Sequence, residues 1–439
     1  MKRVRVIDVA IVQLPFPAMA EPHPLVRDYY RDYSLRYREV VDYWVPDGSL
    51  WELPLWIAHL AGMIRDAGST ARVTDLSQLA ADERVCADRL IAETAPGDVI
   101  MLSPLAQNFD LALAVSRKLM QVGRRTVIGG NMAGLVPEGA ASHVHQGILT
   151  RDSLEQVLHG GGIGVSRILP RRGRGGRLDS VPDYAQLRHY RGKVPLLRLN
   201  ASHGCLYQCS FCGDAWSKQL HVVAPEVLEQ EVQQFEELFP EARLIYIGDK
   251  TFGQSREGIA NLLALFARRP RYRFIVQTHV LQVNERLIDA MRQLGVVIVE
   301  MGFETADSEV LRESHKEVRG VEHYARVIEQ LTAAGMRVIL NVMGGLPHER
   351  AESHVDTLAF LRGPRNQAWL YNLYSFVPYP LTPIFPELKE RIHDWSFANW
   401  REDARPVFHP YHASPDETFG WFLEKVAVAH DLIRDRHVG

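Results

Sequence analysis

Cysteine, net charge and long hydrophobic runs are all scarce in this sequence. Only 4 of the 439 residues are cysteine, and the formal net charge at pH 7 is −3. So weak a charge offers no broad surface for nucleic acid, and four cysteines make a poor disulfide framework for so long a chain. No apolar run approaches the roughly 20 residues that span a bilayer, and the first residues resemble a buried strand without a signal-peptide cleavage site. We therefore expect a cytoplasmic protein whose partners include neither nucleic acid nor a membrane.

The repeating pattern of apolar segments predicts an α/β protein. Within residues 1–160, the strand-like runs VRVIDVAIVQL, ARVTDL, GDVIMLS and RRTVIGG alternate with segments of helical spacing. This alternation is typical of a Rossmann-like parallel sheet with helices on both faces. Ligands of such sheets bind beyond the carboxyl ends of the strands, here residues 15–17, 103–107 and 129–134.

An unusual insertion follows the first expected strand. Residues 22–52 are dense in Tyr, Trp and Arg, and they are far longer than the 2 to 6 residues typical of a βα loop. Either the insertion folds over the ligand end of the first domain or it packs against the next domain. Tyr43, Trp44 and Trp51 are the side chains that we expect to be buried at the domain interface.

Residues 161–195 lose all periodicity and are rich in Gly and Arg, which predicts a linker between domains. The basic run RRGRGGR could contact nucleic acid, but in a near-neutral protein one short run favours a solvated linker. Residues 196–383 then contain six strand–helix units, the number of an open, partial (β/α)6 barrel with its catalytic groups at the strand carboxyl ends. Residues 384–439, rich in aromatics and proline, are expected to form a C-terminal cap.

Three of the four cysteines lie on one short loop directly after the first barrel strand. The stretch NASHGCLYQCSFCG places Cys205, Cys209 and Cys212 in C-x-x-x-C-x-x-C spacing. Three thiolates can hold three irons of a [4Fe–4S] cluster and leave the fourth iron open. The alternative is a structural zinc site, for which His203 or another local histidine would supply the fourth ligand.

This loop, with Phe211 just before the third cysteine, resembles the signature of the radical SAM superfamily. The resemblance implies that S-adenosylmethionine (SAM) chelates the open iron and is split by an electron from the cluster, giving a 5′-deoxyadenosyl radical that removes hydrogen from a substrate. It also implies an external one-electron donor of the flavodoxin or ferredoxin type, and a separate reductase in the pathway is a further candidate partner. The cofactors would carry the hard chemistry, and the barrel would position the substrate.

Further elements of the barrel resemble one subgroup of that superfamily. GFET and NVMGGLPHE match its fourth- and fifth-strand elements, with Thr305 where the subgroup has serine, and IYIGDKTF matches its second strand. A surface or capping carboxylate is the alternative role for Glu304. The residues that the resemblance assigns to binding the cluster or SAM, besides the cysteines, are Phe211, Gly213, Glu304, Lys316, Asn341, Gly345 and Leu346.

Three residues are candidates for catalysis. Tyr207 lies inside the cysteine loop and could donate a hydrogen or a proton, or it could simply pack there. His279 ends the third barrel strand, where side chains face the cavity, although a histidine at such a position is often only a packed, hydrogen-bonded residue. Asp249 occupies the acidic position of the second-strand element. A dehydration in the barrel would need a proton donor of this kind.

Residues 5–160 resemble the cobalamin-binding domain that precedes the barrel in the same subgroup. Two departures weigh against the cofactor. The sequence has no D-x-H-x-x-G loop to supply a histidine to cobalt, and QGILTRDSLEQVL replaces the usual acidic turn. The aromatic insertion could also crowd the ligand face. The sequence therefore slightly favours a cobalamin-binding-like domain that works without cobalamin.

The expected reaction is hydrogen abstraction from a small polar substrate. The arginine-rich composition suggests a GC-rich genome and an antibiotic pathway, and a degenerate cobalamin domain resembles the radical SAM dehydratases of aminoglycoside biosynthesis. A lyase that dehydrates a sugar or aminoglycoside is thus the first interpretation. A cobalamin-dependent methyltransferase acting on carbon or phosphorus is the alternative, and a non-catalytic iron–sulfur redox sensor is the second alternative.

Overall fold

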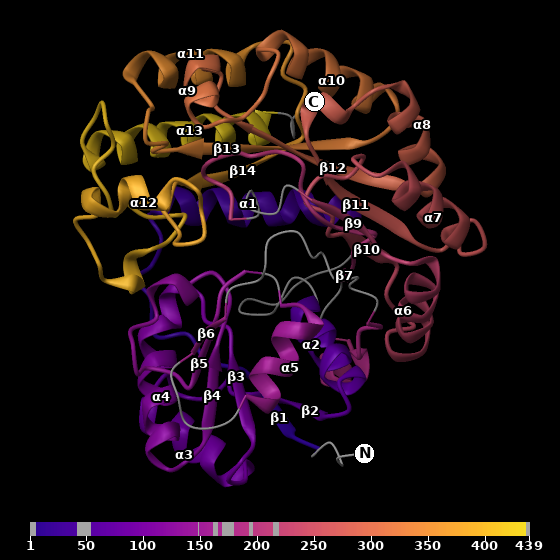
Figure 1. Cartoon of the computed structure of the whole chain (residues 1–439). Coiled ribbons are helices and arrows are strands. Elements are labelled where there is room, and N and C mark those ends of the chain that lie inside the picture. The colour runs from indigo at the N-terminus through magenta and orange to yellow at the C-terminus, as the bar shows by residue number, and fades with distance from the viewer. Residues whose placement is uncertain are drawn as a thin grey trace.

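The computed structural model describes residues 6–41, 54–147, 149–160, 166–168, 180–192, 196–213 and 219–435. Two parallel sheets dominate the described chain, one in each half of the molecule (Figure 1). The α/β class, the Rossmann-like first domain and the partial barrel that the sequence predicts are all confirmed. Among the described helices, none combines the length and the apolar character that crossing a membrane requires.

The first sheet has the strand order β2-β1-β3-β4-β5-β6, and every described pairing in it is parallel. Successive residues of β1 point into opposite core clusters, because side chains of a strand alternate between faces: Val9 and Ile11 pack on one side, Ala10 and Val12 on the other. The order in which the strands are added to the sheet reverses between β1 and β3, and such folds bind ligands at this point. The strands are β1 Asp8–Gln13, β2 Thr70–Asp75, β3 Val99–Leu102, β4 Arg125–Ile128, β5 His143–His145 and β6 Ser166–Ile168, and the helices are α2 Leu55–Asp66, α3 Glu83–Glu93, α4 Phe109–Gln121 and α5 Arg151–His159.

The second sheet has the order β14-β13-β12-β11-β10-β7 and is also parallel. Its order follows the chain without a reversal, so it forms an open arc with β7 and β14 as edges, as expected for six units of a barrel. The strands are β7 Leu196–Leu199, β10 Leu244–Ile247, β11 Arg273–Thr278, β12 Val296–Glu304, β13 Arg337–Gly344 and β14 Leu370–Ser375, and the helices are α6 Pro225–Leu238, α7 Arg256–Phe266, α8 Glu285–Leu294, α9 Ser308–Glu313, α10 Val321–Ala333 and α11 Ala351–Arg362. A short antiparallel pair, β8 Ser202–Gly204 and β9 Leu220–Val222, brackets the cysteine loop.

The expected linker contains ordered structure. Strand β6 lies within residues 161–195 and extends the first sheet. The 3-10 segment Tyr184–Tyr190 (η3) then joins the two halves, because Asp183 donates its backbone N–H to Ala58 of α2 and the Tyr184 hydroxyl donates to Glu231 of α6 at 2.7 Å. The basic run 171–177 lies outside the described residues.

Helix α1, Pro24–Val41, comes from the aromatic insertion and lies along the barrel edge strand β14 (Figure 1). The Tyr29 hydroxyl donates to the Tyr371 carbonyl at 2.5 Å and accepts from the Tyr371 N–H at 3.3 Å. Tyr30 does the same at Leu373, at 2.9 and 3.1 Å. The tyrosines thereby satisfy backbone groups on the outer edge of β14, which pairs with no further strand among the described residues. The insertion therefore packs against the next domain over residues 24–41, whereas Tyr43, Trp44 and Trp51 lie outside the described residues.

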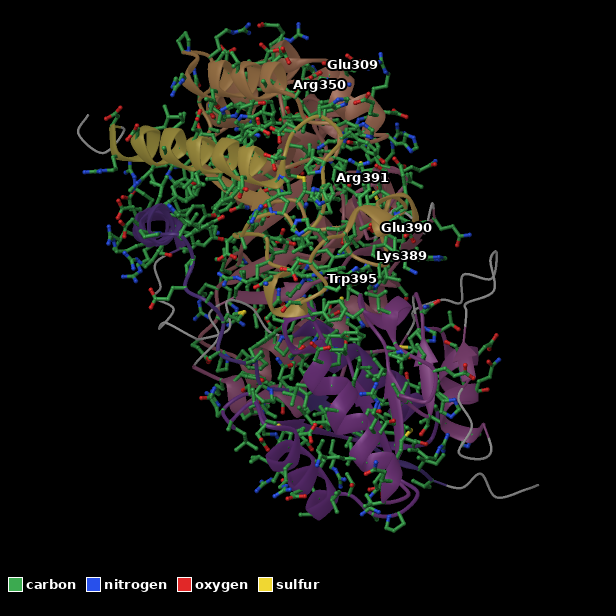
Figure 2. All side chains as sticks on the ribbon, turned by 90° about the vertical axis from the view of Figure 1, so that its left-hand side faces the viewer. Glu309, Arg350, Lys389, Glu390, Arg391 and Trp395 are labelled. Carbon is green, nitrogen blue, oxygen red and sulfur yellow. The ribbon has the colours of Figure 1, made fainter. Side chains whose placement is uncertain are left out.

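The cap after β14 contacts both halves of the molecule. It begins with α12, Phe385–Leu388, and ends with α13, Pro415–Asp435, which packs on α1, β13 and β14. Gln107 of the first domain donates to the Trp400 carbonyl at 2.6 Å, and Trp400 shares one core cluster with Phe109 of α4. Figure 2 shows the cap residues Lys389, Arg391 and Trp395 between the barrel and the first domain. The cap therefore fixes the barrel on the first sheet.

Candidate active site in the barrel and the pocket between the domains

The cysteine loop extends from the carboxyl end of β7 and is held at two points. Ser210 donates its N–H to the Ser314 carbonyl at 2.9 Å, and Ile384 of the cap donates to the Ser210 carbonyl at 3.0 Å. Cys205 is buried, and Cys209 and Cys212 are half-buried. The side chain of Phe211 packs on the core cluster shared with the cap, and Gly213 is the last described residue before residues 214–218. The barrel, the cap and the region around Ser314 together shape this loop.

The surroundings of the thiols fit an iron–sulfur cluster. Gln254 Nε2 donates to Cys205 Sγ at 3.8 Å, and Thr251 Oγ1 lies 3.6 Å from the same sulfur. Burial raises the pKa of Cys209 to about 12, against the opposing charge of Lys316. A bound metal replaces the proton of such a thiol. Hydrogen-bond donors around the sulfurs are the kind of surrounding that tunes such clusters.

His203, the fourth ligand of the zinc alternative, lies toward the first domain. Within the parts of the chain that the structure describes, no three His, Cys, Asp or Glu side chains gather around a point that could hold one metal ion, and this holds for the three cysteines as well. The His203 ring lies edge-on to His59 of the first domain, with centroids 5.6 Å apart, and its Nδ1 lies 3.3 Å from Asn200 Nδ2. His203 therefore lines the space between the domains, where it is among the residues around a pocket described below.

Glu304 and Lys316 form a buried pair at the carboxyl end of β12. Lys316 Nζ lies 2.5 Å from Glu304 Oε1 and donates to the Gly302 carbonyl at 2.7 Å. Burial lowers the pKa of Lys316, but the Glu304 carboxylate more than offsets this and raises it above the usual value. Glu304 has a positive φ of 63°, a strained conformation of the kind that clusters at functional sites. With only 6% of its surface exposed, Glu304 is not a surface carboxylate, and its contact with SAM stays a prediction.

Asp249 holds the turn that leads into the cysteine loop. Its Oδ1 accepts the N–H groups of Ala201 and Ser202 at 2.8 and 2.9 Å, and its Oδ2 accepts the Ser202 hydroxyl at 2.6 Å. Burial raises the pKa of Asp249 to about 6, against these hydrogen bonds, which lower it. Both oxygens are thus engaged in positioning residues 201–202. The geometry favours a positioning role for Asp249 over the proton-transfer role predicted from sequence.

Tyr207 and His279, by contrast, lie together. Their rings stack with centroids 3.9 Å apart, and the Tyr207 hydroxyl accepts from Gln282 Nε2 at 2.8 Å. His279 Nδ1 accepts the Leu281 N–H at 3.2 Å, while its Nε2 is buried without a hydrogen-bond partner among the described residues. Burial, with a smaller effect of Lys316, lowers the pKa of His279 to about 3. The imidazole is therefore neutral, and the stack joins the cysteine loop to the end of β11; its catalytic role stays a prediction.

Polar side chains line the inner face of the barrel, one from each of its six strands. Each is half-buried, on the face opposite the apolar residues that pack under the helices. Tyr246 donates to Glu300 at 3.0 Å, and the Arg198 guanidinium lies over the Tyr246 ring at 5.1 Å. Asn372 donates to Asn341 at 2.9 Å and accepts from the Tyr33 hydroxyl of α1 at 2.9 Å. We call this set the polar ring: Arg198, Tyr246, Gln277, Glu300, Asn341 and Asn372.

The turn after β13 carries the other two predicted SAM contacts. Gly345 donates its N–H to Glu349 Oε2 at 2.7 Å, and Leu346 is fully buried. The element NVMGGLPHE ends in Glu349, but the sequence did not show its hydrogen bond to Gly345, and sequence reasoning missed Glu300, Asn372 and Tyr33. The lone carboxylate of Glu300 in the apolar run VVIVEMGFE was a usable signal, but nothing in the sequence indicated that Tyr33 reaches the barrel.

A pocket of about 730 Å³ lies between the two domains. The first domain contributes the ends of β1, β3 and β4, and α2 contributes the face with Trp56, His59, Leu60 and Met63. The barrel contributes Arg198, Asn200 and His203. The pocket thus lies where the strand order of the first sheet reverses, the position at which such sheets bind ligands.

Two neutral histidines face this pocket. Burial lowers the pKa of His59 to about 3 and that of His203 to about 4, with smaller contributions from His203 to His59 and from His221 and Lys250 to His203. Both Nε2 atoms, and the Asn200 side-chain oxygen, are buried without a hydrogen-bond partner among the described residues. Buried polar atoms normally find a partner. A bulky ligand with an apolar body and a few hydrogen-bonding groups fits these walls.

Comparison with known proteins identifies the class of the barrel domain. Residues 199–361 match the family model described as the radical SAM superfamily. The barrel is a radical SAM domain, and the match supports the [4Fe–4S] cluster and SAM as its cofactors.

Individual relatives are similar to this chain in the first domain as well as in the barrel. Bacteriochlorophyllide d C-12(1)-methyltransferase of Chlorobaculum tepidum is 21% identical, over 72% of this chain and 71% of its own length. The cobalamin-dependent radical SAM methyltransferase TokK of Streptomyces tokunonensis is 24% identical, over 52% of this chain and only 34% of its own length. The methyltransferase TsrM of Kitasatospora setae, solved with cobalamin and a [4Fe–4S] cluster, has the same fold at 15% identity, with a TM-score of 0.61 over 96% of this chain and 89% of its own.

These relatives bear on the reaction predicted from sequence. All three are methyltransferases by name, so they lend no support to a lyase or to an aminoglycoside substrate. They favour the methyltransferase alternative instead. The solved TsrM structure contains cobalamin; for this chain the likeness shows the fold alone.

Proposed function

We propose that this chain is a radical SAM methyltransferase that binds cobalamin between its two domains and acts on a small polar substrate in the barrel. The observation that carries the proposal is the 730 Å³ pocket at the strand reversal of the first sheet, closed above by barrel residues. A fold shared with TsrM over both domains supports it. A redox sensor would need neither this pocket nor the strained Glu304 turn.

The residues divide into three groups in this proposal. Cys205, Cys209 and Cys212 hold the cluster, and the half-buried state of Cys209 and Cys212 leaves a short path from an external flavodoxin- or ferredoxin-type donor. Glu304 and Lys316, Asn341, and the Gly345–Leu346 turn hold SAM, with Phe211 and Gly213 shaping the loop beside it. When bound, the cluster with SAM supplies the hydrogen-abstracting radical, and cobalamin supplies the methyl group.

The polar ring defines the substrate class. Its amide, phenol, carboxylate and guanidinium groups offer both donors and acceptors, and an apolar substrate would remove them from water without adding hydrogen bonds, at a cost. A substrate bearing several hydroxyl or amino groups fits them. The neutral His279 and its stacking partner Tyr207 stand at the rim of this interior, where they can exclude water or donate a proton.

The test uses hydroxocobalamin as the probe and needs no knowledge of the substrate. Anaerobic protein with its cluster reconstituted is mixed with hydroxocobalamin, passed over a gel-filtration column and scanned for corrinoid absorbance. Retention of about one corrinoid per chain, followed by formation of methylcobalamin on reduction with SAM present, is the expected result. Protein that retains no corrinoid and still yields 5′-deoxyadenosine from SAM would overturn the proposal. Products of candidate polyhydroxylated substrates then distinguish gain of a methyl group from loss of water.

A further inference from the structure

A fully buried ion pair ties the C-terminal cap to the turn after β13. The side chains of Lys425 on α13 and Glu349 on the turn have no exposed surface, and the Lys425 ammonium contacts Glu349 Oε1. Lys425 Nζ also donates to the Met343 carbonyl at 3.0 Å, and Glu349 Oε2 accepts the Gly345 N–H at 2.7 Å. The pair is thereby bonded to the end of β13 at Met343 and to the turn at Gly345.

The same turn touches the backbone of α13. A Cβ added to Gly344 would lie 2.8 Å from Phe422 Cβ and 3.1 Å from Phe422 Cα, closer than real Cβ contacts allow. Gly345 has a φ of +72°, a conformation that glycine adopts without strain. The two glycines therefore let α13 approach the turn closely and let the turn take the shape that the ion pair secures.

Other polar contacts of α13 lie nearer the surface. Glu424, the neighbour of Lys425, accepts from His354 of α11 at 2.9 Å, but its side chain is 63% exposed. The contact between His430 and Asp32 of α1, at 2.8 Å, is also partly open to water. Burying a charge is costly unless it is fully paired, so the Lys425–Glu349 pair stands out as the polar contact of α13 that is fully removed from water.

We propose that Lys425 and Glu349 are positioning residues for SAM, which they serve by holding the Gly345–Leu346 backbone in its binding shape. Glu349 keeps the Gly345 N–H satisfied inside the protein, and Lys425 makes a carboxylate tolerable there. The cap thus takes part in SAM binding without touching SAM. The inference depends on SAM binding to the barrel turn as proposed above and is independent of cobalamin.

A coupling of this kind is reciprocal. If docking of α13 improves SAM binding, SAM must strengthen the docking of α13 by the same factor. Addition of SAM should therefore slow amide hydrogen exchange in residues 415–435 of the wild-type holoprotein.

Two double variants separate positioning from plain stability. Lys425→Met with Glu349→Leu replaces the buried pair by apolar side chains, which is often neutral for stability. This variant should stay folded, with a modest loss of stability from the unpaired Gly345 N–H, but bind SAM about tenfold more weakly, the equivalent of one lost hydrogen bond, because nothing accepts that N–H. Lys425→Met with Glu349→Gln keeps an acceptor oxygen in an uncharged side chain. It should bind SAM with nearly wild-type affinity.

Calorimetric titration of SAM into the anaerobic, cluster-loaded proteins gives the affinities, and thermal unfolding gives the stabilities. Glu424→Gln is the matched control on the same helix and should change neither. Equal SAM affinities of the two double variants would overturn the proposal, whether both match the wild type or both are weak, because the acceptor at position 349 would then have no effect. Corrinoid retention by the same preparations reports separately on the proposed function, since this turn does not line the interdomain pocket.

Discussion

The inner face of the barrel and the pocket over the first sheet are both formed by parallel strands, but their side chains differ in kind. The barrel interior carries a polar side chain on every strand, and several are hydrogen-bonded to one another. The pocket over the first sheet is lined mainly by apolar residues, glycines and two neutral histidines. Hydrogen bonds and charge require particular residues at particular positions, whereas an apolar body is held by shape, which many sequences can provide. This difference explains why the barrel has recognisable motifs and the first domain has few.

Removing the cluster ligands should have the largest effect on activity. This effect should be confined to the barrel. We expect a triple variant to lose the cluster iron and all cleavage of SAM when Ala replaces Cys205, Cys209 and Cys212, because no thiolate remains to hold iron. Iron and sulfide analysis with 5′-deoxyadenosine detection checks this, and circular dichroism checks the fold. Cys86→Ala, in the first domain, is the control and should keep its iron. Zinc in reconstituted wild-type protein would contradict the prediction.

Glu304 tests the polar chemistry of the barrel. Glu304→Gln should weaken SAM binding by about 1 to 3 kcal/mol, the range for hydrogen bonds to a charged group, as measured by calorimetry. The exposed Glu309→Gln on α9 (Figure 2) should bind SAM normally. Because the Glu304→Gln substitution leaves Lys316 buried without a counter-charge, a second variant with Lys316→Met added separates stability from affinity. Unchanged affinity in both variants would show that the carboxylate does not contact SAM.

Leu60 tests whether shape governs the pocket of the first domain. Leu60→Trp adds bulk to a half-buried wall residue of α2 and should cost corrinoid binding about 1 to 2 kcal/mol, as overfilling does in packed interiors. SAM affinity should be unchanged. The control, Leu79→Trp, adds the same bulk at an exposed site of the same domain. Corrinoid retention by Leu60→Trp at the wild-type level would place the ligand elsewhere.

The smallest effect is expected where the two regions join. Burial raises the pKa of Glu231 to about 8, against the hydrogen bond from Tyr184, which lowers it. The folded protein then keeps a proton that the unfolded chain loses from about pH 4.5 upward, so stability falls as pH rises to about 8. Glu231→Gln removes this penalty and should raise the unfolding free energy by about 1 kcal/mol more at pH 7 than at pH 6.

Thermal unfolding at both pH values measures the difference. Glu237→Gln, an exposed position on the same helix, is the control and should shift stability equally at the two pH values. An identical shift for Glu231→Gln would mean that its carboxyl is not held in its protonated form.

The parts of the molecule that the sequence predicts are those governed by local pattern. The alternation of strand and helix periods predicts both sheets, and the cysteine spacing predicts the loop at the end of β7. Both patterns depend on residues that are close in the chain. Contacts between residues far apart in the chain carry no such signal. Tyr33 contacts Asn372, 339 positions away, and Glu349 on the turn after β13 contacts Lys425 on α13. Asp249 shows a further limit: its type and position match a motif, but its backbone partners, which decide its role, are visible only in the structure.

The hydrogen bonds of Tyr29 and Tyr30 to β14 make the two domains inseparable as modules. By sequence order α1 belongs with the first sheet, yet its hydroxyl groups complete the last strand of the barrel. A barrel excised without residues 24–41 would present the N–H and C=O groups of Tyr371 and Leu373 to other chains, as an exposed edge strand does when it aggregates. Any chimera that exchanges the first domain must therefore carry helix α1 over with the barrel.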